Sequence, residues 1–202
     1  LFTLNPNHKS NSVGGGNNFI LNLSKFLKKN NFKVIYQIES DIDLIFLIDP
    51  IKKPKFGKNY GLEDALDYKN KYPNTIILYR VNENDKKRNY SSNYEPKMIE
   101  AMKSVNHTTF VSDWLKNYFI NKYKLKINCN SIINGCNKNF FYNIKNSQKF
   151  KNNKIKLVTH HHSDNYLKGF HIYNEIDKLL DKNKNIEFTF IGNYNKEYKP
   201  KH

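Results

Sequence analysis

Residues 155–170 combine side-chain types that could bind a phosphate or a diphosphate. An apolar, β-branched run over residues 155–159 stops abruptly, a polar turn containing Lys168 and Gly169 follows, and a helical pattern occupies residues 170–180. A helix that begins in such a loop directs unpaired backbone N–H groups and the positive end of its dipole at one place. Lys168 adds a full positive charge, which bonds strongly to phosphate oxygens. The spacing matches neither a Walker A loop nor a GxGxxG loop, so the pattern predicts an anion site without naming an enzyme.

Three consecutive histidines and a serine lie between this strand and the lysine. In an extended chain His160 and His162 share one face and His161 points to the other, so at most two of them could bind one metal ion. A third ligand such as Asp164 would then be needed. We therefore expect no metal site. Two interpretations stay open: packing and hydrogen bonding at the strand end, or contact of His161, His162 and Ser163 with a ligand.

A second polar group follows the buried-strand pattern of residues 75–79. Arg80 is the most informative member, because a charge so close to a sheet needs a partner or a ligand. Asn82, Glu83 and Asp85 come next, and a solvated loop would explain all of them. The alternative is a polar cluster that binds ligand hydroxyl groups, with one carboxylate accepting a proton. On that alternative, Arg80, Glu83 and Asp85 are the catalytic candidates and Asn82 lines the cleft.

Three other turns lie where strands are expected to end. A run of three glycines ends in Gly15 and Gly16, where the backbone could approach a ligand closely or simply turn. Ser112 is first of all a helix N-cap, and a second role at a cleft stays open. Asn134 and Gly135 form a typical turn pair.

These sites need elements to position them, and the pattern alternates strands with helices. Alternation of this kind predicts parallel sheets with right-handed crossovers, in which ligands bind at the carboxyl ends of the strands. Glu95 and Glu100 are expected to be ordinary surface residues of a helix. We expect helices at 19–27, 62–66, 95–105, 113–119 and 170–180, and strands at 1–4, 32–38, 44–48, 75–79, 108–111, 131–133, 155–158 and 188–191.

The composition indicates a folded globular protein with a strongly basic balance. The chain has 202 residues, 38% hydrophobic content and a formal net charge of +16. The lysines are spread along the chain and accompany many Asn, Ile, Tyr and Phe, which favours compositional bias over a nucleic-acid-binding arm. Cys129 and Cys136 form no disulfide framework, and no run approaches the roughly 18 apolar residues of a membrane span. We expect a cytoplasmic protein with peripheral contact to an anionic membrane face as an open alternative.

Several of these segments, in this order, resemble the retaining glycosyltransferases of family 4, which have the GT-B fold. The resemblance covers nearly the whole chain and rests on five segments. They are GGGNNF (14–19), LYRVNENDKKRN (78–89), TFVSDWLKNYF (109–119), SIINGCNKNFF (131–141), and LVTHHHSDNYLKGFHIY (157–173) followed by FTFIGN (188–193).

The resemblance implies an α/β fold of GT-B type with two Rossmann-like domains. It implies an acceptor-side domain over residues 1–143, a linker over 144–153, and the start of a donor-binding domain over 154–202. It further implies transfer of a sugar from a nucleotide-sugar donor to a glycan or lipid-linked acceptor, with no cofactor. In this interpretation the donor diphosphate contacts Gly15, Gly16, Lys168 and Gly169, and the cleft is lined by Asn82, Ser112, Asn134, Gly135, His161, His162 and Ser163.

The chain also departs from the family pattern. Asn137 stands where the family usually has an aspartate, and Ser163 stands where many members have an arginine. The glutamate-containing element that usually follows in the donor domain is not in this sequence, so we expect the chain to be inactive by itself. Two other functions stay open: a non-catalytic, truncated GT-B module, or a basic protein that binds nucleic acid.

Overall fold

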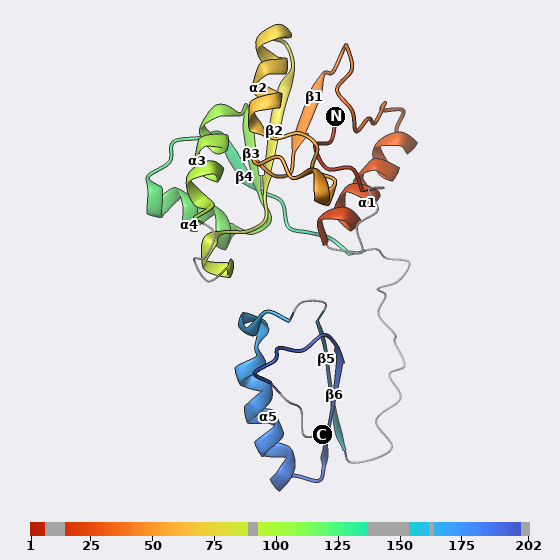
Figure 1. Ribbon diagram of the computed structural model, residues 1–202, viewed down its shortest axis with the longest axis vertical. Coiled ribbons are helices and arrows are strands. Elements are labelled where there is room, and N and C mark those ends of the chain that lie inside the picture. Colours follow the sequence, from red (N-terminus) through yellow and green to blue (C-terminus); the bar gives the residue numbers. More distant parts are fainter. Residues whose placement is uncertain (7–14, 89–92, 137–153, 162–163, 199–202) are drawn as a thin grey trace. The chain divides into compact units, whose positions relative to one another are not determined.

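The computed structural model describes residues 1–6, 15–88, 93–136, 154–161 and 164–198. The chain forms two compact units, an N-terminal unit over Leu1–Gly135 and a C-terminal unit over Cys136–His202. The expected linker, 144–153, lies outside the described residues. Each unit is described by itself below (Figure 1).

A four-stranded parallel sheet forms the centre of the N-terminal unit, with the strands in the order β1-β2-β3-β4. The alternation of strands and helices predicted from the sequence is confirmed, and the arrangement is compatible with a Rossmann-like fold. The strands are β1 (Leu44–Leu47), β2 (Ile76–Val81), β3 (His107–Phe110) and β4 (Cys129–Ser131). The helices are α1 (Gly15–Lys29), α2 (Leu62–Lys71), α3 (Glu95–Ser104) and α4 (Asp113–Tyr123), with short 3-10 turns η1 (Pro54–Phe56) and η2 (Asp85–Arg88).

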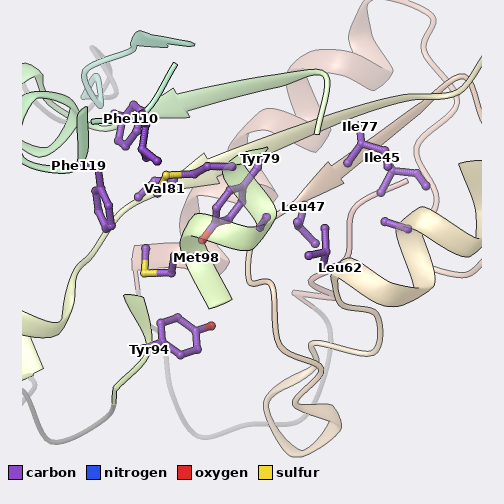
Figure 2. Close-up of a cluster of buried hydrophobic side chains, with 14 of the residues drawn as sticks. Ile45, Leu47, Leu62, Ile77, Tyr79, Val81, Tyr94, Met98, Phe110 and Phe119 are labelled. Carbon is purple, nitrogen blue, oxygen red and sulfur yellow. The ribbon is translucent and has the colours of Figure 1, made fainter. Parts of the chain in front are cut away.

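Helices α2, α3 and α4 cover one face of this sheet and form the main core with it (Figure 2). Successive strand residues point to opposite faces, so alternate residues of β1 and β2 enter this core. Burial of these side chains is the main stabilising term of the unit. The core residues include Ile45, Leu47, Ile77, Tyr79 and Val81 from the strands, and Leu62, Met98, Leu115 and Phe119 from the helices.

The other face of the sheet is covered only in part. Helix α1 lies on this side with a smaller cluster made by Phe2, Leu4, Ile20 and Ile48. Toward the amino ends of the strands, Leu44 is 39% exposed and Ile76 is 49% exposed, although both belong to the sheet. The face beside α1 is therefore less completely covered than the face that carries α2, α3 and α4.

The strand expected at residues 32–38 is not formed, which corrects that prediction. The backbone N–H of Phe32 donates to the carbonyl of Leu27 and thereby closes the end of α1, and the Phe32 side chain is 61% exposed. Contact with the first segment of the chain instead includes the carbonyl of Ile35, which accepts the N–H of Phe2 at 3.0 Å, and the Tyr36 ring, which stacks on Phe2. That first segment joins β1 through a single parallel bridge between Phe2 and Phe46.

The C-terminal unit is one strand–helix–strand repeat. Strands β5 (Ile155–His161) and β6 (Ile186–Gly192) are parallel and are connected through η3 (Tyr166–Lys168) and α5 (Phe170–Lys182). Phe170, Tyr173 and Tyr198 form its core. Within the described parts of both units, no helix is long and apolar enough to cross a membrane.

Replacement of Gly61 by alanine should lower the stability of the N-terminal unit. A Cβ at Gly61 would lie 2.7 Å from the carbonyl oxygen of Pro50 and 3.0 Å from the N of Lys52. Both are backbone atoms of the chain after β1, which packs against the start of α2, so the main chain would have to move, at a cost of about 1–3 kcal/mol. Trp114, the single tryptophan, lies in α4 and reports unfolding of this unit in urea.

The matched control is Gly15→Ala, because a Cβ at Gly15 would meet no atom within 4 Å. We expect its stability to stay within about 0.5 kcal/mol of the wild type. Equal effects of the two substitutions would contradict the close contact between Gly61 and the chain after β1.

Candidate functional site

A pocket of about 670 Å³ opens beside α1 on the incompletely covered face of the N-terminal sheet. Its floor comes from β1 and β2, where Phe46 and Leu78 are direct partners across the two strands. One wall is the first half of α1, and the other is the chain after β4, which runs toward α1 (Figure 1). The lining residues are Gly15, Asn18, Phe19, Asn22, Leu23, Phe46, Leu78, Arg80, Thr109, Phe110, Ile132, Ile133, Asn134 and Gly135.

Arg80 lies in this pocket near the carboxyl end of β2 and is 6% exposed. Its Cζ lies 3.9 Å from the ring centroid of Phe19, so the cation contacts the aromatic face. Its Nη2 donates to Oδ1 of Asn134 at 2.8 Å. No carboxylate among the described residues forms an ion pair with this guanidinium.

Burial of Arg80 is costly for the folded protein. Removal of the guanidinium from water disfavours its charged form and lowers the pKa of Arg80. An arginine nevertheless stays protonated in proteins, so the charge persists inside the pocket. A neutral amide and an aromatic face compensate a buried cation only in part. An anionic ligand would complete the compensation, since Nε and Nη1 form no hydrogen bond within the described residues.

The structure brings four of the predicted site residues to this pocket: Arg80, Asn134, Gly135 and Gly15. Gly16 is half-buried, and a Cβ there would lie 3.7 Å from a side-chain carbon of Leu4. Asn82 and Glu83 are half-buried beyond the end of β2, and neither lines the pocket.

Ser112 has the capping role expected from the sequence. It is the N-cap of α4, and its hydroxyl accepts the N–H of Leu115 at 3.2 Å.

Asp85 has a structural role that the sequence did not indicate. Its carboxylate is 6% exposed and accepts the N–H of Tyr94 at 2.7 and 2.9 Å and the N–H of Glu95 at 2.9 Å. These N–H groups begin α3 and have no partner within the helix. Asp85 therefore fixes α3 to the loop after Arg80, and its assignment as a catalytic residue stays only a prediction.

Glu95 corrects the expectation of an ordinary surface residue, because it is 3% exposed. Its Oε1 accepts the N–H of Asp85 at 3.0 Å and the hydroxyl of Tyr118 at 2.8 Å. Its Oε2 accepts from Lys122 at 2.9 Å and from the hydroxyl of Tyr123. No local sequence pattern marks this role, because Tyr118, Lys122 and Tyr123 lie in α4, more than twenty residues after Glu95. Glu100, in contrast, is exposed as expected.

In the C-terminal unit Lys168 and Gly169 lie immediately before α5, as predicted. Lys168 is exposed at the end of η3. Gly169 has φ of +99°, which a residue with a side chain rarely adopts, and its carbonyl accepts the N–H of Ile172 at 2.8 Å. The positive charge and the helix start therefore stand next to each other.

His161 faces α5, and its Nε2 hydrogen-bonds the hydroxyl of Tyr173. Burial lowers the pKa of His161, and the positive charge of Lys168 lowers it further. The packing interpretation thus describes His161 better than ligand contact does. His162 and Ser163 lie outside the described residues. In the part of the chain that the structure describes, no three His, Cys, Asp or Glu side chains gather as a metal site would require.

Comparisons of the chain with protein-family models, with curated proteins and with solved structures found no match. The roles of these residues therefore rest on the geometry. Sequence reasoning missed Phe19 and Leu78 as site residues because an apolar side chain in a strand or helix is normally assigned to the core.

Replacement of Glu95 by glutamine should destabilise the N-terminal unit by about 2 kcal/mol at pH 7, because it removes a buried, hydrogen-bonded charge. Burial opposes ionisation of this carboxyl, but hydrogen bonds from Tyr123, Lys122 and Tyr118 outweigh it and hold the pKa of Glu95 below its ordinary value. Urea unfolding followed by Trp114 fluorescence measures the effect.

The pH dependence has a defined sign. A lowered pKa in the folded state gives stability that is present above the unfolded value, about 4.3, and is lost as the pH falls through the folded value. The difference between wild type and Glu95→Gln should therefore shrink below about pH 4. Glu100→Gln is the control, because its 3.0 Å pair with Lys97 is exposed on the same helix. A constant difference down to pH 3 would contradict an ionised Glu95.

Proposed function

We propose that this chain takes part in the transfer of a sugar from a nucleotide-sugar donor to an acceptor hydroxyl, as part of a GT-B glycosyltransferase. One observation supports the proposal most. Four segments that resemble family 4 enzymes, although distant in the sequence, contribute residues to the one pocket: Gly15, Asn18 and Phe19; Leu78 and Arg80; Thr109 and Phe110; and Ile132 to Gly135. A resemblance that arose from composition alone would give no reason for the segments to converge.

In this proposal the N-terminal pocket holds the acceptor, with Arg80 as its cationic contact. The position suits a substrate site because ligands of parallel sheets bind at the carboxyl ends of the strands. Arg80 is near the end of β2, and Phe110 is the last residue of β3. A buried arginine with open donors binds oxyanions in a defined orientation.

The C-terminal unit would bind the donor diphosphate through Lys168 and the N-terminus of α5. Transfer breaks the bond between the anomeric carbon and the diphosphate oxygen and forms a bond from that carbon to the acceptor oxygen. The acceptor hydroxyl loses its proton, and the nucleoside diphosphate departs with increased negative charge. Lys168 and the free N–H groups of α5 would stabilise that charge. Of the two carboxylates proposed from the sequence to accept the proton, Asp85 already holds the start of α3, and Glu83 remains as the candidate although it does not line the pocket.

The proposal predicts weak but specific binding of nucleotide sugars at the start of α5. In amide NMR spectra of the 202-residue chain, UDP-glucose or GDP-mannose should shift the signals of Lys168 and Gly169. Lys168→Ala should weaken binding about tenfold, because it removes a charge-assisted contact to phosphate.

Lys184→Ala is the matched control. This exposed lysine precedes β6 and therefore lies at the amino ends of the two strands, whereas Lys168 lies at their carboxyl ends. A single-stranded oligonucleotide tests the competing interpretation, a basic protein that binds nucleic acid. Its binding should fall steeply with salt and should not depend on Lys168. Equal losses from Lys168→Ala and Lys184→Ala, or no nucleotide-sugar binding at millimolar concentration, would contradict the proposed function.

A further inference from the structure

The pocket of the N-terminal unit has one charge and an apolar lining. Among the described lining residues, Arg80 carries the only charged side chain. Six aliphatic or aromatic side chains surround it besides Phe19: Leu23, Phe46, Leu78, Phe110, Ile132 and Ile133. A ligand that fills this space must therefore present apolar surface to most of the wall and an anion at one point.

The lining has four uncharged polar side chains, and two of them, Asn22 and Asn134, already form a hydrogen bond; the other two are Asn18 and Thr109. The amide nitrogen of Asn22 donates to the carbonyl of Asn18 at 2.9 Å. Oδ1 of Asn134 accepts from Arg80. Recognition of a free sugar needs several hydrogen-bonding groups directed at its hydroxyls, because an unpaired hydroxyl in an apolar site is costly. The wall offers few such groups and much apolar surface.

The surface of α1 beside the pocket also combines positive charge with an exposed apolar side chain. Asn18 and Asn22 line the pocket from α1, and the residues three, four and seven positions after Asn22 are Lys25, Phe26 and Lys29. Residues at such spacing follow one another on one helix face. All three are exposed, and the Phe26 side chain is 62% exposed. An apolar ring between two cations suits an anionic amphiphile better than it suits a neutral glycan.

The opposite wall is apolar and exposed as well. Ile132 is 58% exposed and Ile133 is 75% exposed, and both line the pocket. Large aliphatic side chains left in water beside a buried cation form a site whose apolar surface a ligand can bury.

We propose that this pocket binds a phosphate-bearing amphiphile, with the phosphate on Arg80 and an apolar chain against Phe46, Leu78 and Ile133. Nη2 of the guanidinium donates a hydrogen bond to Oδ1 of Asn134, and the N–H groups on Nε and Nη1 can donate to two phosphate oxygens. The first turn of α1, which borders the pocket at Gly15, adds the positive end of a helix dipole. The phosphate is an anchor and not the reacting group. The inference rests on the proposed function, because it identifies the class of acceptor as a phospholipid-like carrier of a hydroxyl group.

Isothermal titration of the full chain with octyl phosphate, below its micelle concentration, tests the proposal. Inorganic phosphate and octyl glucoside serve as the anion-only and chain-only probes. Octyl phosphate should bind at least about tenfold more tightly than either probe, because both parts of the ligand contribute. Arg80→Gln should lose about tenfold in octyl phosphate affinity, and Arg80→Lys should lose less, since it keeps the charge without the fork.

A second variant tests the apolar part without disturbing the core. Ile133→Ser changes a side chain that is already exposed, so the fold should persist, as Trp114 fluorescence can verify. It should weaken octyl phosphate binding several-fold and leave inorganic phosphate binding unchanged. Val158→Ser, at a 66% exposed residue of the other unit, is the control and should have no effect.

The opposite results would overturn the inference. Inorganic phosphate that binds as tightly as octyl phosphate would show a plain phosphate site, and octyl glucoside that binds as tightly would show a site without anion preference. Neither result bears on nucleotide-sugar binding at Lys168, so failure here is distinguishable from failure of the proposed function.

Discussion

The buried charge of Arg80 is the constraint on which the site depends. A guanidinium that is 6% exposed must be compensated, and in this protein an aromatic ring and one amide oxygen do so in part. Those two contacts connect β2 with α1 and with the chain after β4. The same contacts that reduce the cost of burial therefore form two walls of the pocket, and the charge that remains is directed at a ligand.

The unequal cover of the sheet explains why this cation has a pocket beside it. Three helices cover one face, and the alternation along the strands sends Tyr79 and Val81 into that core. Arg80 lies between these two residues in the sequence and therefore points to the face where α1 lies alone. Behind the site, Asp85 and Glu95 join the loop after β2 to α3 and α4. The three-helix face of the sheet thus holds the loop that follows Arg80 in place.

Much of the fold followed from local patterns, whereas the site did so only in part. The apolar run that begins at Thr75 indicated a buried strand, and Arg80 stood out because a charge so close to a sheet needs a partner or a ligand. Ser112 was recognisable as a cap, since capping depends on neighbours in the sequence. The roles of Phe19 and Glu95 depend on residues more than twenty positions away, Arg80 for one and Lys122 for the other, so no local pattern reveals them. The missing strand at residues 32–38 has a similar cause, because an apolar run does not show whether a neighbouring strand is available.

The most direct measurement of the central claim observes the guanidinium itself. Arg80 and Arg88 are the only arginines in the sequence, so their Nε–Hε signals in an NMR spectrum can be assigned by single substitutions. If Arg80 is a buried cation that can bind an anion, its Nε–Hε proton should exchange slowly with water. Its signal should shift on addition of an alkyl phosphate, while the Arg88 signal should not shift. The account would be contradicted by an Arg80 proton that exchanges rapidly and whose signal does not shift with the anion, or by Arg80 and Arg88 signals that shift by the same amount.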